Sequence, residues 1–151
     1  MEIRLAQAQD IDGWMALIEP LRAVFPGLET AAAMEEHRSA VLHFIENSAA
    51  VCAVQEGRIA GALLFSAQRG ELCFLAVDPA FRRRGIGREL FSFLLSRMEE
   101  GRDISLITYP ADDPNGQAAR AFYRHLGFSA GRMTCAFGRP AQEFILRRGG
   151  R

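Results

Sequence analysis

The stretch FLAVDPAFRRRGIGRELFSFLL, residues 74–95, runs from an apolar segment through three arginines and two glycines into an amphipathic segment. The apolar face of that last segment is formed at helical spacing by Leu90, Phe91, Leu94, Leu95 and Met98. Positive side chains are disfavoured at a helix start, where the helix dipole is positive. The free N–H groups of a helix start bind anions, and glycine lets an anion approach the backbone. The stretch therefore predicts an anion site, against the alternative of a tight turn with solvated arginines.

The whole chain has the composition of a soluble globular protein, and we expect one domain over residues 1–151. It is 49% hydrophobic and 24% charged, with a net charge of zero. This balance favours neither nucleic acid nor an anionic membrane as a partner. All 18 basic residues are arginine. The absence of lysine excludes Schiff-base chemistry and a Walker A phosphate loop.

Targeting and metal signals are missing from the sequence. The start MEIRLAQAQD lacks the basic and apolar regions of a secretory signal, and no apolar run reaches membrane-spanning length. The three cysteines are widely spaced and form no CxxC pair, which is typical of reduced thiols in a cytoplasmic protein. The three histidines have no metal-ligand spacing, so we expect a cytoplasmic protein without a metal site.

Periodicity predicts an α+β protein with a mixed sheet. Strands are expected at 2–6, 49–55, 58–68, 71–77, 103–109, 132–138 and 142–148, the last two as a hairpin that turns at Arg139-Pro140. Helices are expected after an Asp10 cap, after a Thr30 cap, after Gly87, and over 117–126. Strand alternation places Glu71, Cys73, Leu75 and Val77 on one face.

Two motifs resemble those of the GNAT superfamily of acyl-CoA-dependent N-acyltransferases. Arg82, Gly85 and Gly87 fill the superfamily's first motif, after the lead-in LAVDP. The stretch NGQAARAFYRHLGF, residues 115–128, is similar to its second signature. The expected element order also matches along nearly the whole chain. The resemblance implies a three-layer α/β/α fold, with helices on both faces of a mixed, mostly antiparallel sheet.

The resemblance also implies acetyl-CoA as the cofactor, with coenzyme A as product. Pantetheine would lie along Leu75, Ala76 and Val77. The pyrophosphate would sit on the turn formed by Arg82, Arg83, Arg84, Gly85, Ile86, Gly87 and Arg88, so the anion of the opening stretch would be this pyrophosphate. Asn115 resembles the superfamily's asparagine near the cofactor, although it could instead cap the following helix.

Tyr123 resembles the superfamily's general acid, which would protonate or hydrogen-bond the leaving thiolate. Helical spacing places Ala118, Phe122 and Leu126 on the inner stripe, and Tyr123 beside it. The alternative is a tyrosine that only packs.

Glu71 falls where some members of the superfamily carry a general base, and a protonated amine must lose a proton before it attacks. The alternative is a solvated carboxylate at the strand start. A second alternative mechanism makes Cys73 an acyl-carrying nucleophile, but no histidine lies near it in the sequence.

The predicted function is transfer of an acetyl group to a primary amine of a small molecule by direct attack. A second copy of the chain, in a homodimer, is the other partner considered. Acidity around the amine could come from Glu29, Glu35, Glu36, Asp112 and Asp113. The alternatives are a protein or peptide N-acetyltransferase and a non-catalytic acyl-CoA-binding or sensor module, which would not need Tyr123.

Overall fold

The computed structural model describes residues 1–149. The strands are β1 (Glu2–Leu5), β2 (Ala50–Gln55), β3 (Arg58–Ser66), β4 (Glu71–Val77), β5 (Ile104–Thr108), β6 (Ser129–Ala136) and β7 (Arg139–Leu146). The α-helices are α1 (Ile11–Ile18), α2 (Ala31–Glu46), α3 (Ile86–Arg97) and α4 (Gln117–His125). Short 3₁₀ helices are η1 (Ala8–Asp10), η2 (Glu19–Val24), η3 (Pro79–Phe81) and η4 (Pro114–Gly116). The expected order of strands and α-helices is confirmed.

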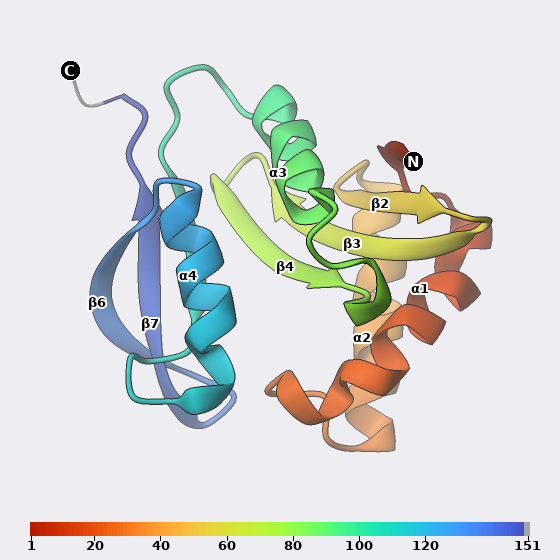
Figure 1. Ribbon diagram of the computed structural model, residues 1–151, viewed down its shortest axis with the longest axis horizontal. Helices are drawn as coiled ribbons and strands as arrows, with labels where there is room; N and C mark the ends of the chain where they lie inside the picture. The colour runs from red at the N-terminus through yellow and green to blue at the C-terminus, as the bar shows by residue number, and fades with distance from the viewer. Residues whose placement is uncertain (150–151) are drawn as a thin grey trace.

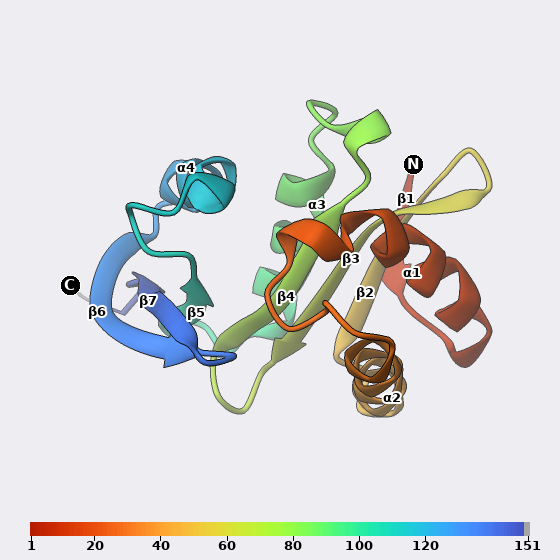
Figure 2. The same ribbon diagram turned by 90° about the horizontal axis from the view of Figure 1, so that it is seen from below.

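The strands form one sheet in the order β1-β2-β3-β4-β5-β7-β6. Neighbouring strands are antiparallel except β4 and β5, which are parallel. In the described chain β4 and β5 share a single register pair, Glu71 with Ser105. Beyond that pair the two strands diverge, and the sheet opens like a V between β4 and the β5–β7–β6 part (Figures 1 and 2).

Helices cover both faces of the sheet, which confirms the three-layer α+β fold. On one face, α3 and α4 enclose a core that includes Leu63, Leu90, Phe91, Leu106 and Phe144. On the other face, α1, η2 and α2 enclose a second core. That second core is centred on Trp14, whose side chain is fully buried. The V-shaped opening of the sheet therefore lies between the α3–α4 core on one face and the α1–α2 core on the other (Figure 2).

Local sequence explains several element boundaries. The Thr30 hydroxyl accepts a hydrogen bond from the Ala33 N–H at 3.0 Å, which is the predicted cap of α2. Helix α1 ends at Ile18, two residues before Pro20. Helix α4 is followed by Gly127 with φ of +105°, a backbone conformation that favours glycine at a helix end.

Two predicted local features are wrong. Asp10 does not cap α1. Its carboxylate instead pairs with the Arg4 guanidinium at 2.8 and 3.0 Å and accepts from the Gln7 N–H. The β6–β7 turn lies at Phe137 and Gly138, with φ of +53° and +71°, so Arg139 and Pro140 already belong to β7. Two successive positive φ values suit a tight two-residue hairpin turn.

Strand β4 contains a β-bulge that breaks the predicted alternation. Phe74 pairs with Leu64 and Leu72 pairs with Phe65, so Cys73 is an extra residue opposite β3. Leu72, Leu75 and Val77 face the α3–α4 core, whereas Phe74 and Ala76 face the α1–α2 core. Because Cys73 is an extra residue, the alternation of side chains between the two faces is interrupted there, and Glu71, Cys73, Leu75 and Val77 do not share one face as predicted.

Candidate active site

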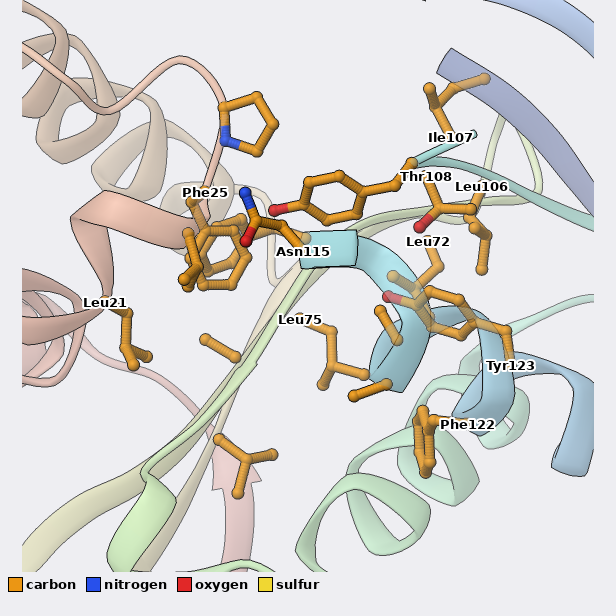
Figure 3. A pocket seen from close by; sticks show the side chains of 18 of the residues that line it. Leu21, Phe25, Leu72, Leu75, Leu106, Ile107, Thr108, Asn115, Phe122 and Tyr123 are labelled. Atoms are coloured by element: carbon orange, nitrogen blue, oxygen red, sulfur yellow. The ribbon is translucent and has the colours of Figure 1, made fainter. Parts of the chain in front are cut away.

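A cavity of about 1020 Å³ lies where β4 and β5 diverge. Its walls are the cavity side of β4, the turn before α3, the end of β5, the start of α4, η2 with the loop after it, and the β6–β7 turn. Figure 3 shows side chains from these elements converging on one space. The cavity passes between the two cores, so one ligand can contact both sides of the sheet.

The turn before α3 offers free backbone N–H groups to this cavity. Gly85 precedes α3 with φ of +78°, and no described side chain caps the helix. The first helical hydrogen bond runs from the Glu89 N–H to the Gly85 carbonyl at 2.9 Å. The N–H groups of Ile86, Gly87 and Arg88 precede it and have no acceptor within the helix. With the positive end of the helix dipole, they form a site suited to an anion.

The two glycines of this turn have different physical roles. A Cβ added at Gly85 would meet nothing within 4 Å, so glycine is favoured there by its positive φ. Gly87 lies in the first turn of α3, and a Cβ there would come within 2.9 Å of the Phe122 ring on α4. Gly87 therefore allows the close approach of α4 to α3, besides leaving the backbone open to a ligand.

The arginines of the motif point to different surroundings. Arg82, Arg83 and Arg88 line the cavity, together with Gly85, Ile86 and Gly87. Arg84 does not line it in the described structure. Its guanidinium lies 3.7 Å from a Glu56 carboxylate oxygen and 5.0 Å from the centre of the Phe81 ring. Arg84 therefore packs the turn against the body of the protein.

The predicted cofactor strand lies directly on the cavity. Leu75, Ala76 and Val77 all line it. Past Glu71, no described β4 residue pairs with β5. The β4 edge that faces the V therefore keeps main-chain groups free to bind an extended ligand.

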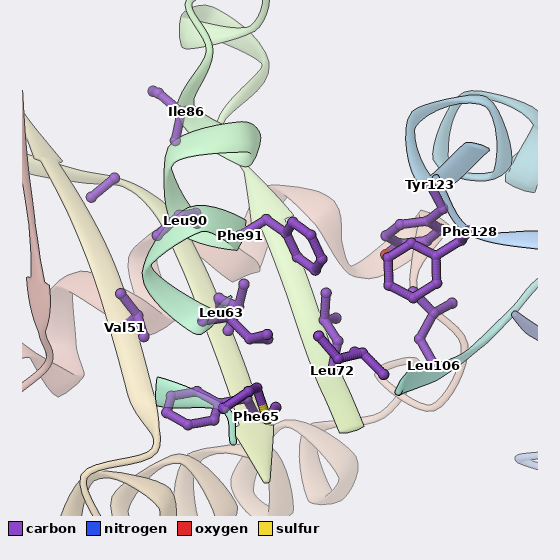
Figure 4. Packing of buried hydrophobic residues seen from close by; sticks show 14 of the residues in the cluster. Val51, Leu63, Phe65, Leu72, Ile86, Leu90, Phe91, Leu106, Tyr123 and Phe128 are labelled. Carbon is purple, nitrogen blue, oxygen red and sulfur yellow. The ribbon is translucent and has the colours of Figure 1, made fainter. Parts of the chain in front are cut away.

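Tyr123 is deeper in the protein than helical spacing predicted. Its side chain is 9% exposed, and its ring packs against Phe128 and Phe144 at 6.0 and 6.4 Å between centroids. Ala118, expected on the inner stripe, is exposed. Figures 3 and 4 show the Tyr123 ring extending from α4 toward the space between β4 and β5, next to Leu106.

The Tyr123 hydroxyl reaches the cavity without a protein partner. It forms no hydrogen bond to a described residue. Since no buried side-chain N or O atom of the described residues lacks a partner, this hydroxyl is accessible from the cavity. Burial, with a smaller contribution from Tyr109, raises the pKa of Tyr123 well above its usual range. The phenol therefore stays protonated at neutral pH and can donate a hydrogen bond into the cavity.

Glu71 and Cys73 lie at the other end of β4 and also line the cavity. The Glu71 carboxylate pairs with the Arg69 guanidinium at 3.1 Å. Cys73 is exposed to solvent, but partial desolvation by the surrounding residues, followed by the nearby Glu71 charge, raises the pKa of its thiol. A thiol with a raised pKa holds its proton at neutral pH, which disfavours Cys73 as a nucleophile.

Asn115 lines the cavity from η4 and does not cap α4. The side-chain cap in this loop is Asp113, whose carboxylate accepts from the Asn115 N–H at 2.9 Å. The residue that precedes α4 is Gly116, without a side-chain cap. The Asn115 amide is therefore not used as a helix cap, and Figure 3 shows it among the side chains that line the cavity.

Comparison with known proteins identifies the family. The model of the acetyltransferase (GNAT) family matches residues 14–128, which is most of the chain. The chain belongs to the GNAT acetyltransferase family. It is accordingly an acyltransferase. No curated protein sequence matches the chain.

Solved structures agree with this family in fold. A GNAT acetyltransferase from Bacillus cereus has 18% identity and a TM-score of 0.74, covering 97% of this chain and 96% of its own. The ribosomal-protein-S18-alanine N-acetyltransferase of Escherichia coli has 19% identity and a TM-score of 0.70, with coverages of 99% and 95%. An aminoglycoside 6'-N-acetyltransferase complexed with coenzyme A has 18% identity and a TM-score of 0.66, with coverages of 100% and 99%. At such identities the likeness shows the fold alone.

The sequence analysis missed a buried polar network that holds α4 of this GNAT protein in place. The Arg120 side chain, 7% exposed, donates to the Tyr109 carbonyl and to the Gln142 side-chain oxygen, both at 2.8 Å. Gln142 in turn donates to the Gly131 carbonyl at 2.9 Å. Arg120 lies about one helical turn before Tyr123, so these hydrogen bonds hold the Tyr123 side chain in position relative to β5. The available signal was the spacing of Arg120 and Tyr123, which are three residues apart and therefore lie on the same face of α4.

A group of aromatic side chains on the α1–α2 side was also missed. Phe74 of β4 lies 5.0 Å from Phe25 and 4.8 Å from His37 between ring centroids. Phe25, His37 and Phe74 line the cavity, as does Phe137 of the β6–β7 turn. We call these four residues the aromatic wall. They come from four separate elements or loops, so no sequence motif joins them.

His37 is a neutral member of this wall. Its Nε2 accepts a hydrogen bond from the Trp14 indole N–H at 3.3 Å, which places the imidazole proton on Nδ1. Burial lowers the pKa of His37 below its usual range. His37 therefore adds no positive charge to the cavity near neutral pH.

The far end of the cavity is bridged by a clasp between the loop after η2 and the β6–β7 turn. Arg139 pairs with Glu29 at 3.2 Å. A Cβ at Gly27 would lie 2.5 Å from the Phe137 ring, so this ring packs directly on Gly27. Glu35 and Glu36, two of the predicted acidic residues, are exposed on α2 and do not line the cavity within residues 1–149.

Two further properties concern the described residues only. No group of three or more His, Cys, Asp or Glu side chains there is arranged to hold a metal ion. Among their helices, none has the length and apolar character required to span a bilayer.

Proposed function

We propose that this acyltransferase transfers the acetyl group of acetyl-CoA to a primary amine of a small molecule by direct attack. One observation carries the proposal: the same cavity contains the free N–H groups of the α3 start and the unpartnered hydroxyl of Tyr123. The first feature suits a pyrophosphate, and the second suits a leaving group that develops negative charge.

The cofactor fits the residues that line the cavity. The N–H groups of residues 86–88 would hold the pyrophosphate, with Arg82 and Arg83 adding charge-assisted hydrogen bonds. The free β4 edge at Leu75–Val77 would pair with the pantetheine amides. Asn115, which lines the cavity, would contact the same cofactor. When bound, acetyl-CoA supplies an activated thioester carbonyl.

In the proposed reaction, the neutral amine nitrogen attacks the thioester carbonyl carbon. A C–N bond forms, the C–S bond breaks, and the electron pair of that bond leaves on sulfur. Tyr123 donates a hydrogen bond or its proton to this sulfur. Its raised pKa makes hydrogen-bond donation the easier of the two. Glu71, the first residue of β4, is the candidate to accept the proton that the amine loses.

A thermal-unfolding titration with acetyl-CoA tests the proposal, with ATP as the control polyanion. A ligand at about a hundred times its Kd stabilises the folded state by roughly 2.7 kcal/mol. For a protein of this size we expect a Tm rise of roughly 5–10 °C. The rise should appear with acetyl-CoA and not with ATP. An unchanged Tm at millimolar acetyl-CoA would contradict the cofactor assignment and the reaction built on it.

A further inference from the structure

The two sides of the cavity offer different chemistry to a ligand. On the α3–α4 side, arginines and free N–H groups suit an anionic cofactor. On the α1–α2 side, the aromatic wall is extended by the apolar residues Leu21, Val24, Pro26, Leu28 and Pro140, all of which line the same cavity. Val24 and Phe137 are 44% and 72% exposed. Large apolar side chains that stay exposed around a cavity mark a surface that a ligand can cover.

Most carboxylates near the wall already have partners within the protein. Glu29 pairs with Arg139 at 3.2 Å and also accepts from the Gly27 N–H at 3.0 Å. Glu71 pairs with Arg69, and Asp113 caps η4. Asp112 is exposed at the cavity rim. This side is therefore poorly equipped to bind a molecule that carries several positive charges.

The clasp limits the shape of what can enter. The loop after η2 contacts the β6–β7 turn across the cavity, through Gly27 with Phe137 and Glu29 with Arg139. These contacts join the two edges of the cavity opening. A polypeptide would need an open groove across these edges for the residues that follow its N-terminus. A small molecule needs only the space inside the cavity.

We infer that the acceptor is a small primary amine with one cationic nitrogen and an apolar body about the size of an aromatic ring. Phe25, Phe74 and Phe137 contact this body, and neutral His37 does not repel the ammonium group. The inference rests on the proposed function, because it names the acceptor of that same reaction. It assigns a binding role to four residues that belong to neither sequence motif.

The test compares acceptors with the wild-type protein and acetyl-CoA, and measures the release of free coenzyme A thiol. The probes are 2-phenylethylamine, ethanolamine, spermidine and a five-residue peptide with an N-terminal alanine. We expect kcat/KM for 2-phenylethylamine to exceed each of the others by about tenfold or more, which is the scale of burying part of an aromatic ring. Equal or faster transfer to ethanolamine, spermidine or the peptide would overturn the inference.

A matched pair of variants tests the wall itself. Phe137→Ala should raise KM for 2-phenylethylamine by about tenfold and leave KM for acetyl-CoA unchanged. Phe137 is 72% exposed, so its removal should not prevent folding. Met133→Ala is the control, because Met133 is a 57% exposed apolar residue of the same hairpin that does not line the cavity in the described structure. An equal effect of both variants would overturn the role of the wall.

Binding measurements separate a failed inference from a failed function. If acetyl-CoA does not raise Tm, the proposed function fails and the inference falls with it. If acetyl-CoA raises Tm but no amine is acetylated, 2-phenylethylamine should still raise Tm further in the presence of coenzyme A, whereas ethanolamine should not. The absence of that further rise would overturn the inference while the cofactor assignment stands.

Discussion

The two ends of the cavity are built by different means. The proposed cofactor end is formed by residues 82, 83 and 85–88, and its proposed ligand groups are main-chain N–H groups at the start of α3. The proposed acceptor end is a set of side chains from the η2–α2 region, β4 and the β6–β7 turn, all of which line the cavity. A backbone site needs a local sequence and can be preserved by a few glycines. A side-chain site needs correct packing of distant segments and can change by single substitutions.

Tyr123 lies between the two ends, and its removal should give the largest effect. In Tyr123→Phe the leaving sulfur loses its hydrogen-bond donor, so we expect kcat to fall by about 10²-fold, the scale of general acid catalysis. The Tm rise with acetyl-CoA should be retained, since the turn at 82–88 is untouched. Steady-state kinetics with the best acceptor checks this, beside the thermal titration. A kcat within about threefold of wild type would assign the phenol to packing, and loss of the Tm rise would assign it to cofactor binding.

Gly85 tests the cofactor end alone, and Gly57 provides a matched control. Both have φ near +78°, at +78° and +77°, and a Cβ at either would meet nothing within 4 Å. Alanine at each site should therefore cost about 1–2 kcal/mol of stability through left-handed strain, or a few degrees in Tm.

Only Gly85→Ala should also weaken acetyl-CoA binding, by roughly 3- to 10-fold, through misplaced N–H donors. Gly57 lies in the β2–β3 turn, away from the cavity. Calorimetric titration with acetyl-CoA measures the difference. Equal affinities for the two variants would mean that the shape of the turn does not matter for the cofactor.

His37 tests the acceptor end, with the smallest expected effect. Its pKa is lowered by burial, so below about pH 6.5 the unfolded chain binds a proton that the folded protein does not. Stability from this group is present above pH 6.5 and is lost as the pH falls toward the lowered folded pKa. His37→Gln keeps an acceptor for Trp14 but cannot titrate.

The wild type should therefore lose more Tm than His37→Gln between pH 7.5 and 5.5, by about 1–2 °C. Parallel melting curves of the two proteins in matched buffers check this. Identical losses would show that His37 is not held neutral in the wall.

The sequence predicted those features of the fold that depend on interactions between residues close together in the chain. The order of strands and α-helices and the Thr30 cap depend on neighbouring residues, and the structure has them as predicted. Asp10 failed as a cap because an ion pair with Arg4, on another element, is the stronger interaction for its carboxylate. The bulge at Cys73 could not be predicted, because it is set by register against β3.

The candidate site divides in the same way. The lining residues 75–77, 82, 83 and 85–88 follow from one contiguous motif. Arg84 departs from that group because its guanidinium contacts Glu56, which is distant in the sequence, and the ring of Phe81, three residues before it. The burial of Tyr123 depends on Arg120, whose anchors are Tyr109 and Gln142. The aromatic wall depends wholly on how α2, β4 and two loops pack.

The divergence of β4 and β5 has a consequence for how the chain unfolds. In the described structure one register pair, Glu71 with Ser105, joins the two parts of the sheet, and on the α3–α4 side Phe91 contacts Phe128 at 5.6 Å between centroids. Regions with few shared contacts can open independently of each other. A ligand in the V would contact both parts at once and couple their opening. We therefore expect occupancy of the cavity to change the cooperativity of unfolding as well as the stability of the protein.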